Sequence, residues 1–431
     1  MAFSSFFSGL AGLQAHSGKL NVIGDNLANL NTIGFKASRT IFADVFSQSA
    51  GGASVNGAGN PIQVGLGVQT ASIDQIFSQG SLQTTGVVTD MAIQGNGFFV
   101  LADSAGGRTF SRAGHFTFDR DGNLVNGAGH FVQGFTSKDA RGKILASGPI
   151  SNIVVPAGLT SPPQATSSIE MVANLDANAP NGGTFSTTIS VFDSLGAQHD
   201  INVTFTGVDT AVPPDGISDE WDLDLTIDGG EVAGGTAGTP FSLAPTTRLQ
   251  FDATGQLISP ASDISFTTPA FANGAAAQAI TYQLLNPTTG KGNLTRFADM
   301  SAASSVNQDG FGVGQIRALT INPDGLVSGI FSNAVTIELA QVALATFNNP
   351  NGMLKNGLST LIGTTASGSA TIGAANAGGR GSITSSALEL SNTDITEEFT
   401  DLIITERGYQ ANSRIITTTD QVIQEALSLK R

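Results

Sequence analysis

Residues 20 to 36 read LNVIGDNLANLNTIGFK, and this stretch sets the fold at the N-terminal end of the chain. Apolar side chains recur at heptad spacing through it and just before it, which is the pattern of a helix that packs one face against a partner helix. Asparagines and Gly34 follow, and glycine readily takes the left-handed conformation that ends a helix. The apolar positions of this predicted seam are Leu13, Leu20, Ile23, Leu27 and Leu30.

The far end of the chain carries a second seam. Apolar residues recur there every seven positions, with further apolar residues at the companion positions near both ends. Glu406, Ser413 and Asp420 interrupt the companion column, which favours a helix with one dry face and another near water or neighbouring subunits. We expect the two terminal helices to pair as a coiled coil. The C-terminal seam consists of Leu388, Ile395, Phe399, Leu402, Tyr409, Ile416, Ile423 and Leu427.

Periodicity alone leaves two interpretations of these seams open. Apolar stripes at helical spacing form the core of an ordinary bundle as readily as they form a self-assembly surface. A pair of long terminal helices without a catalytic constellation favours a structural subunit whose ends polymerise.

The composition limits the class of protein. The chain has 431 residues, of which 40% are hydrophobic and 12% charged, enough for two or three domains with cores of their own. Its 53 glycines indicate many tight turns and a β-rich body. The net charge of −15 argues against a nucleic-acid partner, because phosphate binding needs clustered lysine and arginine.

The absence of cysteine excludes disulfides, thiolate metal sites and cysteine nucleophiles. The first residues lack the basic region of a cleaved export signal and continue directly into the heptad pattern. No apolar run in the sequence reaches the length of a membrane-spanning helix. We therefore expect no membrane insertion, and any export would leave the N-terminus uncut.

Two Gly-rich segments separate the terminal helices from the rest of the chain. They read SQSAGGASVNGAGNP and GTTASGSATIGAANAGGRG, and neither can bury much apolar surface. We predict a terminal helical domain formed by residues 1–33 with 385–431. Residues 34–70 with 363–384 are predicted to be flexible linking arms between this domain and the body.

The middle of the chain has the pattern of antiparallel β structure. The segment FDRDGNLV at residues 118–125 is echoed by FDATGQLI and INPDGLV, each with the acidic or amide residue and the glycine of a hairpin turn. Alternating apolar and polar residues around Trp221 indicate strands with one dry face. We predict a first β body domain at 71–150 with 300–362. Residues 151–299 are predicted to form an inserted outer β domain, either a barrel or a sandwich.

The search for catalytic chemistry is largely negative. The four histidines are scattered without metal-ligand spacing. Asp119 and Asp121 suggest a calcium loop only faintly, because its glycine and glutamate positions are not met, and a hairpin turn explains them better. The glycines from Gly310 to Gly314 lack the strand-to-helix context of a phosphate loop. We predict a protein without enzymatic activity, catalytic residues, cofactor or metal.

Three groups of motifs resemble one family, the bacterial flagellar rod and hook axial proteins. They are NLANLNTIGFK after the N-terminal seam, GNGFF with RAGHFTFD in the proximal body, and ERGYQANSR within the C-terminal seam. The resemblance covers both ends and the proximal body in chain order, and it does not cover the middle. The family positions that it carries over are Asn26, Asn29, Asn31, Thr32, Gly34, Phe35, Lys36, Arg112, Gly114, Phe116, Tyr409, Gln410 and Asn412.

This resemblance implies a structural subunit that assembles with many copies of itself into a curved, flexible tube around an export channel. The tube would join rod to filament as a universal joint. The resemblance also implies export through the flagellar type III apparatus and a location outside the cell. The implied neighbours are a rod protein below, a hook–filament junction protein above and a hook cap during assembly.

Two alternatives to this interpretation stay open at the level of sequence. The size of the middle segment favours a hook-type member over the distal rod members, which are much shorter. A secreted β-rich adhesin is the alternative from a different class. Gly408 is an unusual residue for the interior of a helix, and it either permits close packing against a neighbour or is merely tolerated.

Overall fold

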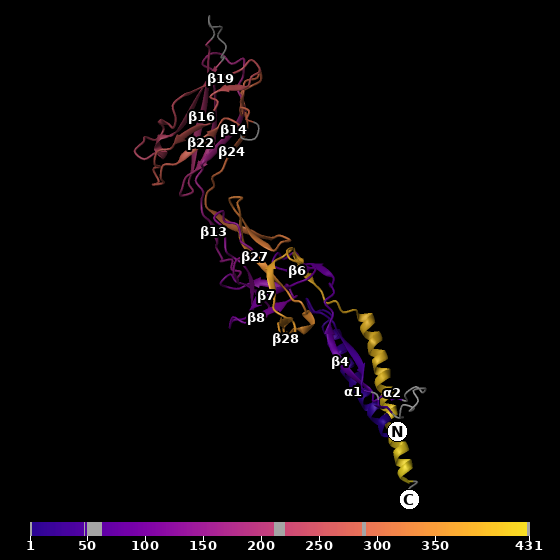
Figure 1. The fold of residues 1–431 in the computed structure, drawn as a ribbon. Coiled ribbons are helices and arrows are strands. Elements are labelled where there is room, and N and C mark those ends of the chain that lie inside the picture. The colour runs from indigo at the N-terminus through magenta and orange to yellow at the C-terminus, as the bar shows by residue number, and fades with distance from the viewer. Residues whose placement is uncertain (1, 47, 50–62, 211–219, 287–289, 429–431) are drawn as a thin grey trace, which may run out of the picture. The chain divides into compact units, whose positions relative to one another are not determined.

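The computed structural model describes residues 2–46, 48–49, 63–210, 220–286 and 290–428, and Figure 1 shows it as a ribbon. Strands predominate, and one long helix lies near each end of the chain. The fold is therefore mostly β with N- and C-terminal α-helices, as the sequence predicts.

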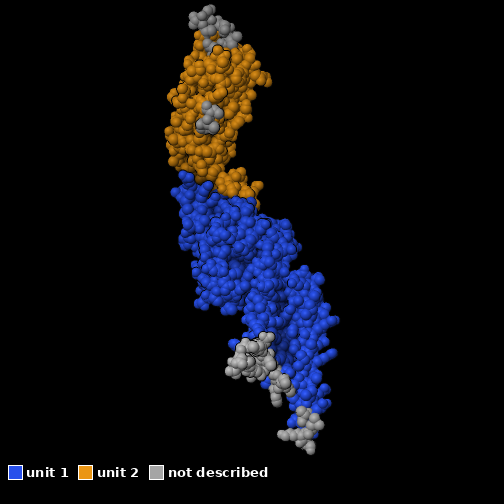
Figure 2. Space-filling model, turned by 45° about the vertical axis from the view of Figure 1, so that its right-hand side comes forward, with its two compact units in different colours: residues 1–157, 319–329, 337–431 blue, residues 158–318, 330–336 orange. Residues whose placement is uncertain are grey.

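The chain divides into two compact units, which Figure 2 colours separately. The first unit comprises residues 1–157, 319–329 and 337–431, and the second comprises residues 158–318 and 330–336. The second unit is therefore an insertion into the first. It takes in more of the chain beyond residue 299 than the outer domain predicted from the sequence.

The terminal helices of the first unit pack against each other. They are α1 (Ala2–Ala28) and α2 (Ile395–Ser428), and both appear in the lower part of Figure 1. The Asp394 carboxylate accepts hydrogen bonds from the backbone amides of Thr396 and Glu397 at the start of α2. An aspartate at this position satisfies amide groups that have no partner within the helix, so it fixes where α2 begins.

The prediction that Leu388 lies in the C-terminal helix is wrong. Leu388 belongs to β32 (Ala387–Glu389), which pairs with β5 (Leu82–Thr84). Heptad counting joins Leu388 to Ile395 because both are apolar, although the helix-capping Asp394 stands between them. Leu30 likewise lies beyond the end of α1, in the turn that follows it.

The first predicted linking arm is largely a β-hairpin. β1 (Ser38–Asp44) pairs antiparallel with β4 (Val68–Gln75), and β2 (Gln48–Ser49) pairs with β3 (Gln63–Val64). Both β1 and β4 pack on α1, so this part of the chain is not a flexible arm. Residues 50–62, which hold most of the glycine-rich sequence, lie outside the described residues.

The second predicted arm is also paired into sheets. β30 (Thr371–Ala374) pairs with β27 (Thr336–Thr346), and β31 (Ser382–Ser385) pairs with β6 (Met91–Gln94). Ladder hydrogen bonds between backbone groups need no large side chains, so a run of small residues can form edge strands. Ile383 supplies the apolar anchor and is 1% exposed. The prediction of a flexible arm from 363 to 384 is therefore wrong for these strands.

An antiparallel sheet in the order β27–β11–β7–β8–β29–β28 forms the centre of the first unit. Successive side chains along a strand point to opposite faces. Phe99 and Leu101 accordingly join one buried cluster, whereas Phe98 and Val100 join another. Both faces of the sheet are therefore covered. The strands not yet delimited are β7 (Phe98–Ala102), β8 (Arg108–Ser111), β11 (Phe131–Phe135), β12 (Ile150–Asn152), β28 (Leu354–Gly357) and β29 (Thr360–Ile362).

The recurring hairpin turn predicted from the sequence is confirmed at two hairpins, β9–β10 and β19–β20. Asp119 accepts hydrogen bonds from two amides of the first turn, and Asp252 does so in the second. Gly122 and Gly255 follow with φ of 83° and 77°, a conformation that favours glycine. The four strands are β9 (Phe116–Phe118), β10 (Leu124–Asn126), β19 (Thr247–Phe251) and β20 (Leu257–Ser259).

The second unit is a β-sandwich. One sheet has the order β15–β16–β17–β19–β20, with β18 beside β17, and the other has the order β21–β22–β14–β23, with β24 beside β14. β14 runs parallel to β22 and β23, and the other pairings are antiparallel. Phe205 and Trp221 from one sheet meet Ile169 and Tyr282 from the other in a single core. Among the strands that the structure describes, no closed barrel forms.

The remaining strands and the two short 3₁₀ helices have the following bounds. The sandwich strands are β14 (Ser168–Asn174), β15 (Thr184–Phe192), β16 (Gln198–Val208), β17 (Glu220–Asp228), β18 (Pro240–Ser242), β21 (Ile264–Thr267), β22 (Ala279–Gln283), β23 (Leu294–Thr295) and β24 (Ala302–Gln308). The others are β13 (Thr160–Ser161), β25 (Gly314–Ile321), β26 (Leu326–Phe331) and the short 3₁₀ helices η1 (Gly229–Glu231) and η2 (Pro350–Gly352).

A buried polar network lies at one edge of the sandwich. His199 has its Nε2 3.0 Å from Asp193 Oδ2 and its Nδ1 2.8 Å from Glu231 Oε2, and its ring stacks on Phe271. The Asn273 amide also donates to Asp193 Oδ2. Burial opposes ionisation of Asp193, but the hydrogen bonds from Asn273, His199 and two backbone amides outweigh it and lower its pKa from 3.8 to about 2.

Because of this network, the stability of the second unit depends on pH. A carboxylate with a lowered pKa stabilises the folded state above pH 4, and that contribution disappears as the pH falls from about 4 to about 2. We predict that Asp193→Asn lowers the unfolding temperature at pH 6, and that the gap to the wild type closes by pH 2. Fluorescence of Trp221, the only tryptophan in the chain, reports the transition. An equal gap at both pH values would contradict the prediction.

Candidate assembly site

The two terminal helices approach each other closely because glycines line their contact. Gly9 of α1 faces Ile415 and Ile416, and a Cβ at Gly12 would lie 2.7 Å from the Asn412 Oδ1 atom of α2. At that distance a side chain at Gly12 would displace the Asn412 side chain, so glycine allows both helices to keep this close contact. The pairing runs antiparallel, because low-numbered residues of α1 meet high-numbered residues of α2.

Gly408 of the C-terminal motif has the same role on the other helix. A Cβ at this position would lie 2.8 Å from the His16 Cε1 atom of α1. Of the two interpretations that the sequence left open, close packing is therefore the correct one. Glycine has a poor helical propensity, but α2 tolerates Gly408 because a glycine leaves room for the His16 imidazole of α1.

Polar contacts fix the register of the helix pair. Lys19 Nζ lies 2.8 Å from Asp401 Oδ2, and the Asn26 amide donates to Glu398 Oε1 at 2.7 Å. Asn26 is 2% exposed and also exchanges two hydrogen bonds with the backbone of Ser38. This single motif residue therefore connects α1, α2 and β1.

The structure places the predicted seam residues in three environments. Ile23 is 3% exposed, and the other α1 seam residues are half-buried, as are Leu402, Tyr409, Ile416 and Ile423 on α2. By contrast, Ile395, Phe399 and Leu427 are 46%, 48% and 64% exposed. The helix pair therefore covers only part of the apolar seam.

Sequence reasoning missed a further apolar face of α2, which we call the α2 stripe. It consists of Ile404, Ile415 and Val422, which are 60%, 44% and 52% exposed. Their spacings of eleven and seven residues correspond to about three and about two helical turns, so they share one side of the helix. The buried residues that face α1 include the polar Thr405 and Thr419. Three apolar side chains therefore lie exposed along one side of an otherwise mostly polar helix surface.

A signal for the α2 stripe does exist in the sequence. Apolar doublets occur at 403–404, 415–416 and 422–423. Neighbouring residues on a helix point about 100° apart, so a repeated doublet indicates two apolar faces rather than one. Heptad counting assigned one member of each later doublet to the seam and passed over the other.

After α1 the chain turns sharply, and residues 29–37 form a segment that we call the elbow. Gly34 has φ of 67°, its amide donates to the Glu389 carbonyl oxygen at 2.8 Å, and a side chain there would clash with the Arg112–Ala113 backbone. Thr32 donates to the Asn29 side chain, which in turn donates to Asp25. The turn is therefore specified by hydrogen bonds and by the space available to glycine.

The motif residues of the elbow and the body converge on Glu389, which sequence reasoning did not select. Its carboxylate is 0% exposed and lies 2.6 Å from Lys36 Nζ and 3.5 Å from Arg112 Nη1. It also accepts a hydrogen bond from the amide of Gly80, while Lys36 donates to the Ser78 carbonyl oxygen. We call Lys36, Arg112 and Glu389 the buried ionic cluster.

Arg112 is held from several directions at once. Its guanidinium donates to the Ile93 and Gly95 carbonyl oxygens at 3.3 and 2.7 Å and lies over the Phe98 ring. Burial lowers the pKa of Arg112 and of Lys36, and the charge of Glu389 opposes this shift in both. The cluster thus carries two cations that depend on one buried carboxylate.

The other motif residues have mainly structural environments. A side chain at Gly114 would overlap the Met91 carbonyl oxygen, and Phe116 is fully buried in the body core. Gln410 and Asn412 each bond within α2, to Glu406 and to the Gly408 carbonyl oxygen. Asn31 is exposed.

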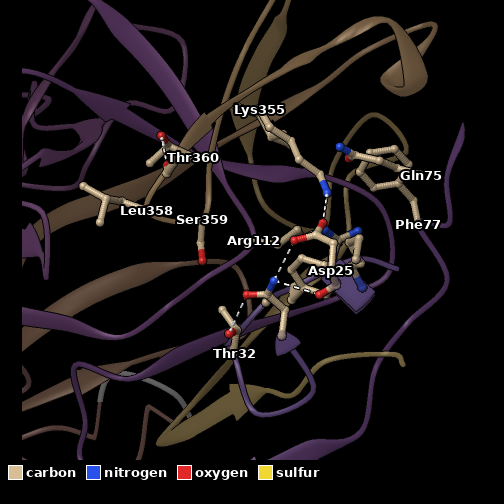
Figure 3. A pocket seen from close by; sticks show the side chains of 15 residues that line it. Asp25, Thr32, Gln75, Phe77, Arg112, Lys355, Leu358, Ser359 and Thr360 are labelled. Atoms are coloured by element: carbon tan, nitrogen blue, oxygen red, sulfur yellow. Dashed lines mark hydrogen bonds and ion pairs between the residues drawn. The ribbon is translucent and has the colours of Figure 1, made fainter. Parts of the chain in front are cut away.

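A pocket opens beside the elbow and is shown in Figure 3. It has a volume of about 190 Å³. Asp25, Thr32 and Phe35 line one side, and the turn between β28 and β29 lines another. Lys355 lies over the Phe35 ring and within 3.5 Å of the Asp25 carboxylate, so it forms part of the rim. We call this hollow the elbow pocket.

The described part of the chain offers neither a cluster of metal ligands nor a membrane-spanning helix. It contains no group of three or more histidine, cysteine, aspartate or glutamate residues placed to hold a metal ion. None of its helices is long and apolar enough to cross a membrane.

Family models match the chain in four consecutive regions. Residues 8–36 match "Flagella basal body rod protein" and residues 92–170 match "Flagellar hook protein FlgE/F/G D1 domain". Residues 160–311 match "Flagellar basal body protein FlaE D2 domain", and residues 384–429 match "Flagellar basal body rod FlgEFG protein C-terminal". Together with the paired terminal helices and the β body, these matches define the class as a flagellar rod or hook axial protein.

Full-length relatives narrow the class to one family. The chain is 37% identical to the flagellar hook protein FlgE of Treponema pallidum and 36% identical to that of Borreliella burgdorferi, with 99% of each chain covered in both comparisons. It is 34% identical to the same protein of Salmonella typhimurium, over 99% of this chain and 100% of the relative. The chain belongs to the flagellar hook protein FlgE family. It is a structural hook subunit, and the rod and adhesin alternatives are not favoured.

The buried ionic cluster gives a direct test of the elbow. Replacing Glu389 by glutamine leaves two buried cations without a counter-charge, and breaking a buried pair in this way costs about 3–5 kcal/mol. We predict a loss of that size in the unfolding free energy of Glu389→Gln, measured by denaturant titration with circular dichroism. The Lys36→Met, Glu389→Gln double variant should lose less than the sum of the single variants, because it removes one of the stranded cations.

The exposed pair Arg120–Asp121 provides the matched control. Its side chains are 93% and 69% exposed, so Asp121→Asn should change stability by less than about 0.5 kcal/mol. If Glu389→Gln were as stable as this control, the buried ionic cluster would not be what holds the elbow.

Proposed function

We propose that many copies of this chain self-assemble into the curved, flexible tube of the flagellar hook, which transmits motor torque from rod to filament as a universal joint. The paired terminal helices form the inner layer around an export channel, and the two β units form the outer layers. The chain acts structurally, without enzymatic activity or a cofactor.

The observation that carries this proposal is the uncovered α2 stripe. An isolated subunit leaves Ile404 and Val422 more than half exposed, and Ile415 is 44% exposed although it also lies against Gly9 of α1. Exposed apolar side chains aligned on one helix face mark an interaction surface. A neighbouring copy can cover the stripe and so add the apolar contact area that a stable inner layer requires.

The elbow determines how a subunit responds to bending. The buried ionic cluster and the glycine contacts fix the helix pair to the first β unit. Changes in subunit length during rotation therefore take place between copies, at contacts that can slide, rather than within the elbow. This replaces the flexible arms that the sequence suggested.

The proposed partners follow from the hook location of the family. They are further copies of the chain, a rod protein at the base, a hook–filament junction protein at the tip, a hook cap during assembly and the flagellar type III export apparatus. The proposed location is extracellular, in the flagellar hook. A chain without cysteine suits this route, because it can pass unfolded without forming wrong disulfides.

Charge placed on the α2 stripe tests the proposal. We predict that Ile404→Asp with Val422→Asp prevents polymerisation of the purified chain, because the neighbouring copy would have to bury two unpaired carboxylates. The monomer should keep its circular dichroism spectrum and melting temperature, since both side chains are more than half exposed. Sedimentation and electron microscopy measure the polymer.

Gln421→Asp is the control for one added carboxylate, to be compared with Ile404→Asp alone, because this exposed residue lies on the same helix but on a different side. It should polymerise as the wild type does. Normal tubes from the Ile404→Asp, Val422→Asp variant would remove the basis of the proposed inner layer.

A further inference from the structure

The turn between β28 and β29 adopts an unfavourable backbone conformation. Leu358 and Ser359, the two residues of the turn, have φ of 51° and 56°, and Gly357 before them has φ of 81°. Two-residue hairpin turns with positive φ at both positions strongly favour asparagine and glycine. A leucine in this region is rare because its Cβ collides with the following carbonyl group.

The described part of the subunit gives Leu358 little burial in return for this conformation. Leu358 is 76% exposed, and Leu354 on the same hairpin is 64% exposed. The backbone around them is well held, because Thr360 Oγ1 donates to the Gly357 carbonyl oxygen and Ser111 Oγ donates to that of Ser359. The hairpin thus presents an apolar side chain to solvent from a rigid, strained position, and such strain tends to persist where a contact requires it.

The exposed leucine stands at the rim of the elbow pocket. Leu358, Ser359 and Thr360 line that pocket, and Figure 3 shows them opposite Asp25 and Thr32. A second hollow of about 450 Å³ is lined by Leu354 and shares Asp25, Gln75 and Lys355 with the elbow pocket. The hairpin therefore places an exposed leucine at each of two neighbouring hollows.

The charge around the elbow pocket favours an acidic and apolar occupant. Its lining includes Lys36, Arg112 and Lys355, and the carboxylates of Glu389 and Asp25 balance two of these three charges, which leaves a net positive charge. The start of α2 has the complementary character, because residues 394–406 contain five acidic residues and no lysine or arginine. This segment also presents an exposed apolar face, to which we refer as the Phe399 face. It comprises Ile395, Phe399 and Ile403 at 46%, 48% and 50% exposure.

The two surfaces lie at the same end of the helix pair. Asn392, just before α2, donates to the Ile76 carbonyl oxygen and accepts from the Ala37 amide. Ile76 and Ala37 are the direct neighbours of Phe77 and Lys36, which line the elbow pocket. Subunits of a helical polymer contact each other through different patches of the same molecule. Patches at the same distance from the polymer axis are the ones that can meet.

We propose that the elbow pocket of one copy receives the Phe399 face of a second copy, with Leu358 packed against the entering side chain. This inference rests on the proposed self-assembly and adds the identity of one contact. The contact is heterologous, so each subunit offers its own Phe399 face to one neighbour and its pocket to another. Burial of Leu358 and Phe399 in the polymer offsets the strain that the monomer carries.

The Leu358→Asn substitution distinguishes the role of Leu358 in polymerisation from its effect on the stability of the monomer. Asparagine tolerates the left-handed conformation, so Leu358→Asn should raise the melting temperature of the monomer. The same change removes the packed side chain, and we expect the critical concentration for polymerisation to rise at least tenfold. Leu195→Asn is the control, because Leu195 is 58% exposed in the second unit and should leave the critical concentration unchanged.

The absence of cysteine allows a direct test of proximity. Chains carrying Leu358→Cys and chains carrying Phe399→Cys are mixed, polymerised and oxidised, so that any heterodisulfide joins two different copies. We expect such a cross-link in the polymer and none in the monomer mixture. Leu195→Cys mixed with Phe399→Cys should give none in either.

The outcomes distinguish this contact from the proposed function itself. Normal polymers without the cross-link, together with an unchanged critical concentration for Leu358→Asn, would overturn the elbow contact and leave the self-assembly proposal intact. Failure of the wild-type chain to polymerise would overturn both. A cross-link accompanied by weakened assembly and a stabilised monomer would support the contact.

Discussion

The first unit depends on one carboxylate, that of Glu389. It lies on β32, just before the chain enters α2, and it holds Lys36 from the elbow and Arg112 from the body sheet. Two buried cations would be very unfavourable without it, so the three segments can pack only together. The direction in which both terminal helices leave the body is therefore set by an ionic contact, whereas apolar packing and glycine spacing set how the helices approach each other.

The sequence was sufficient for the features that depend on periodicity and turn chemistry. The strand alternation around Trp221 and the Asp–Gly turns at Gly122 and Gly255 follow from side-chain pattern alone, and the structure has both. The helical character of both ends was evident for the same reason. The described parts of the predicted arms are instead paired into sheets, because strand pairing such as that of β31 with β6 uses backbone groups, which composition does not reveal.

The sequence predicted only part of the candidate site, and the reason for this is also physical. Heptad counting finds residues that face a partner, but it does not show which partner covers them. It placed Leu388 in a helix and overlooked Ile404 and Val422, whose side of α2 the subunit leaves uncovered. Glu389 carried no periodic signal, since its importance comes from two cations 353 and 277 residues away in the sequence, at Lys36 and Arg112.

The pairing of the two ends also dictates an order of folding. Asn26 and Glu398, which bond across the helix pair, are separated by 372 residues. Whichever end of the chain becomes available first, α1 has no partner helix until α2 is also present. Contacts so distant in sequence form slowly, because a very long loop must close before they are gained. The second unit lies within residues 158–336 and needs neither end of the chain, so it can fold ahead of the helix pair.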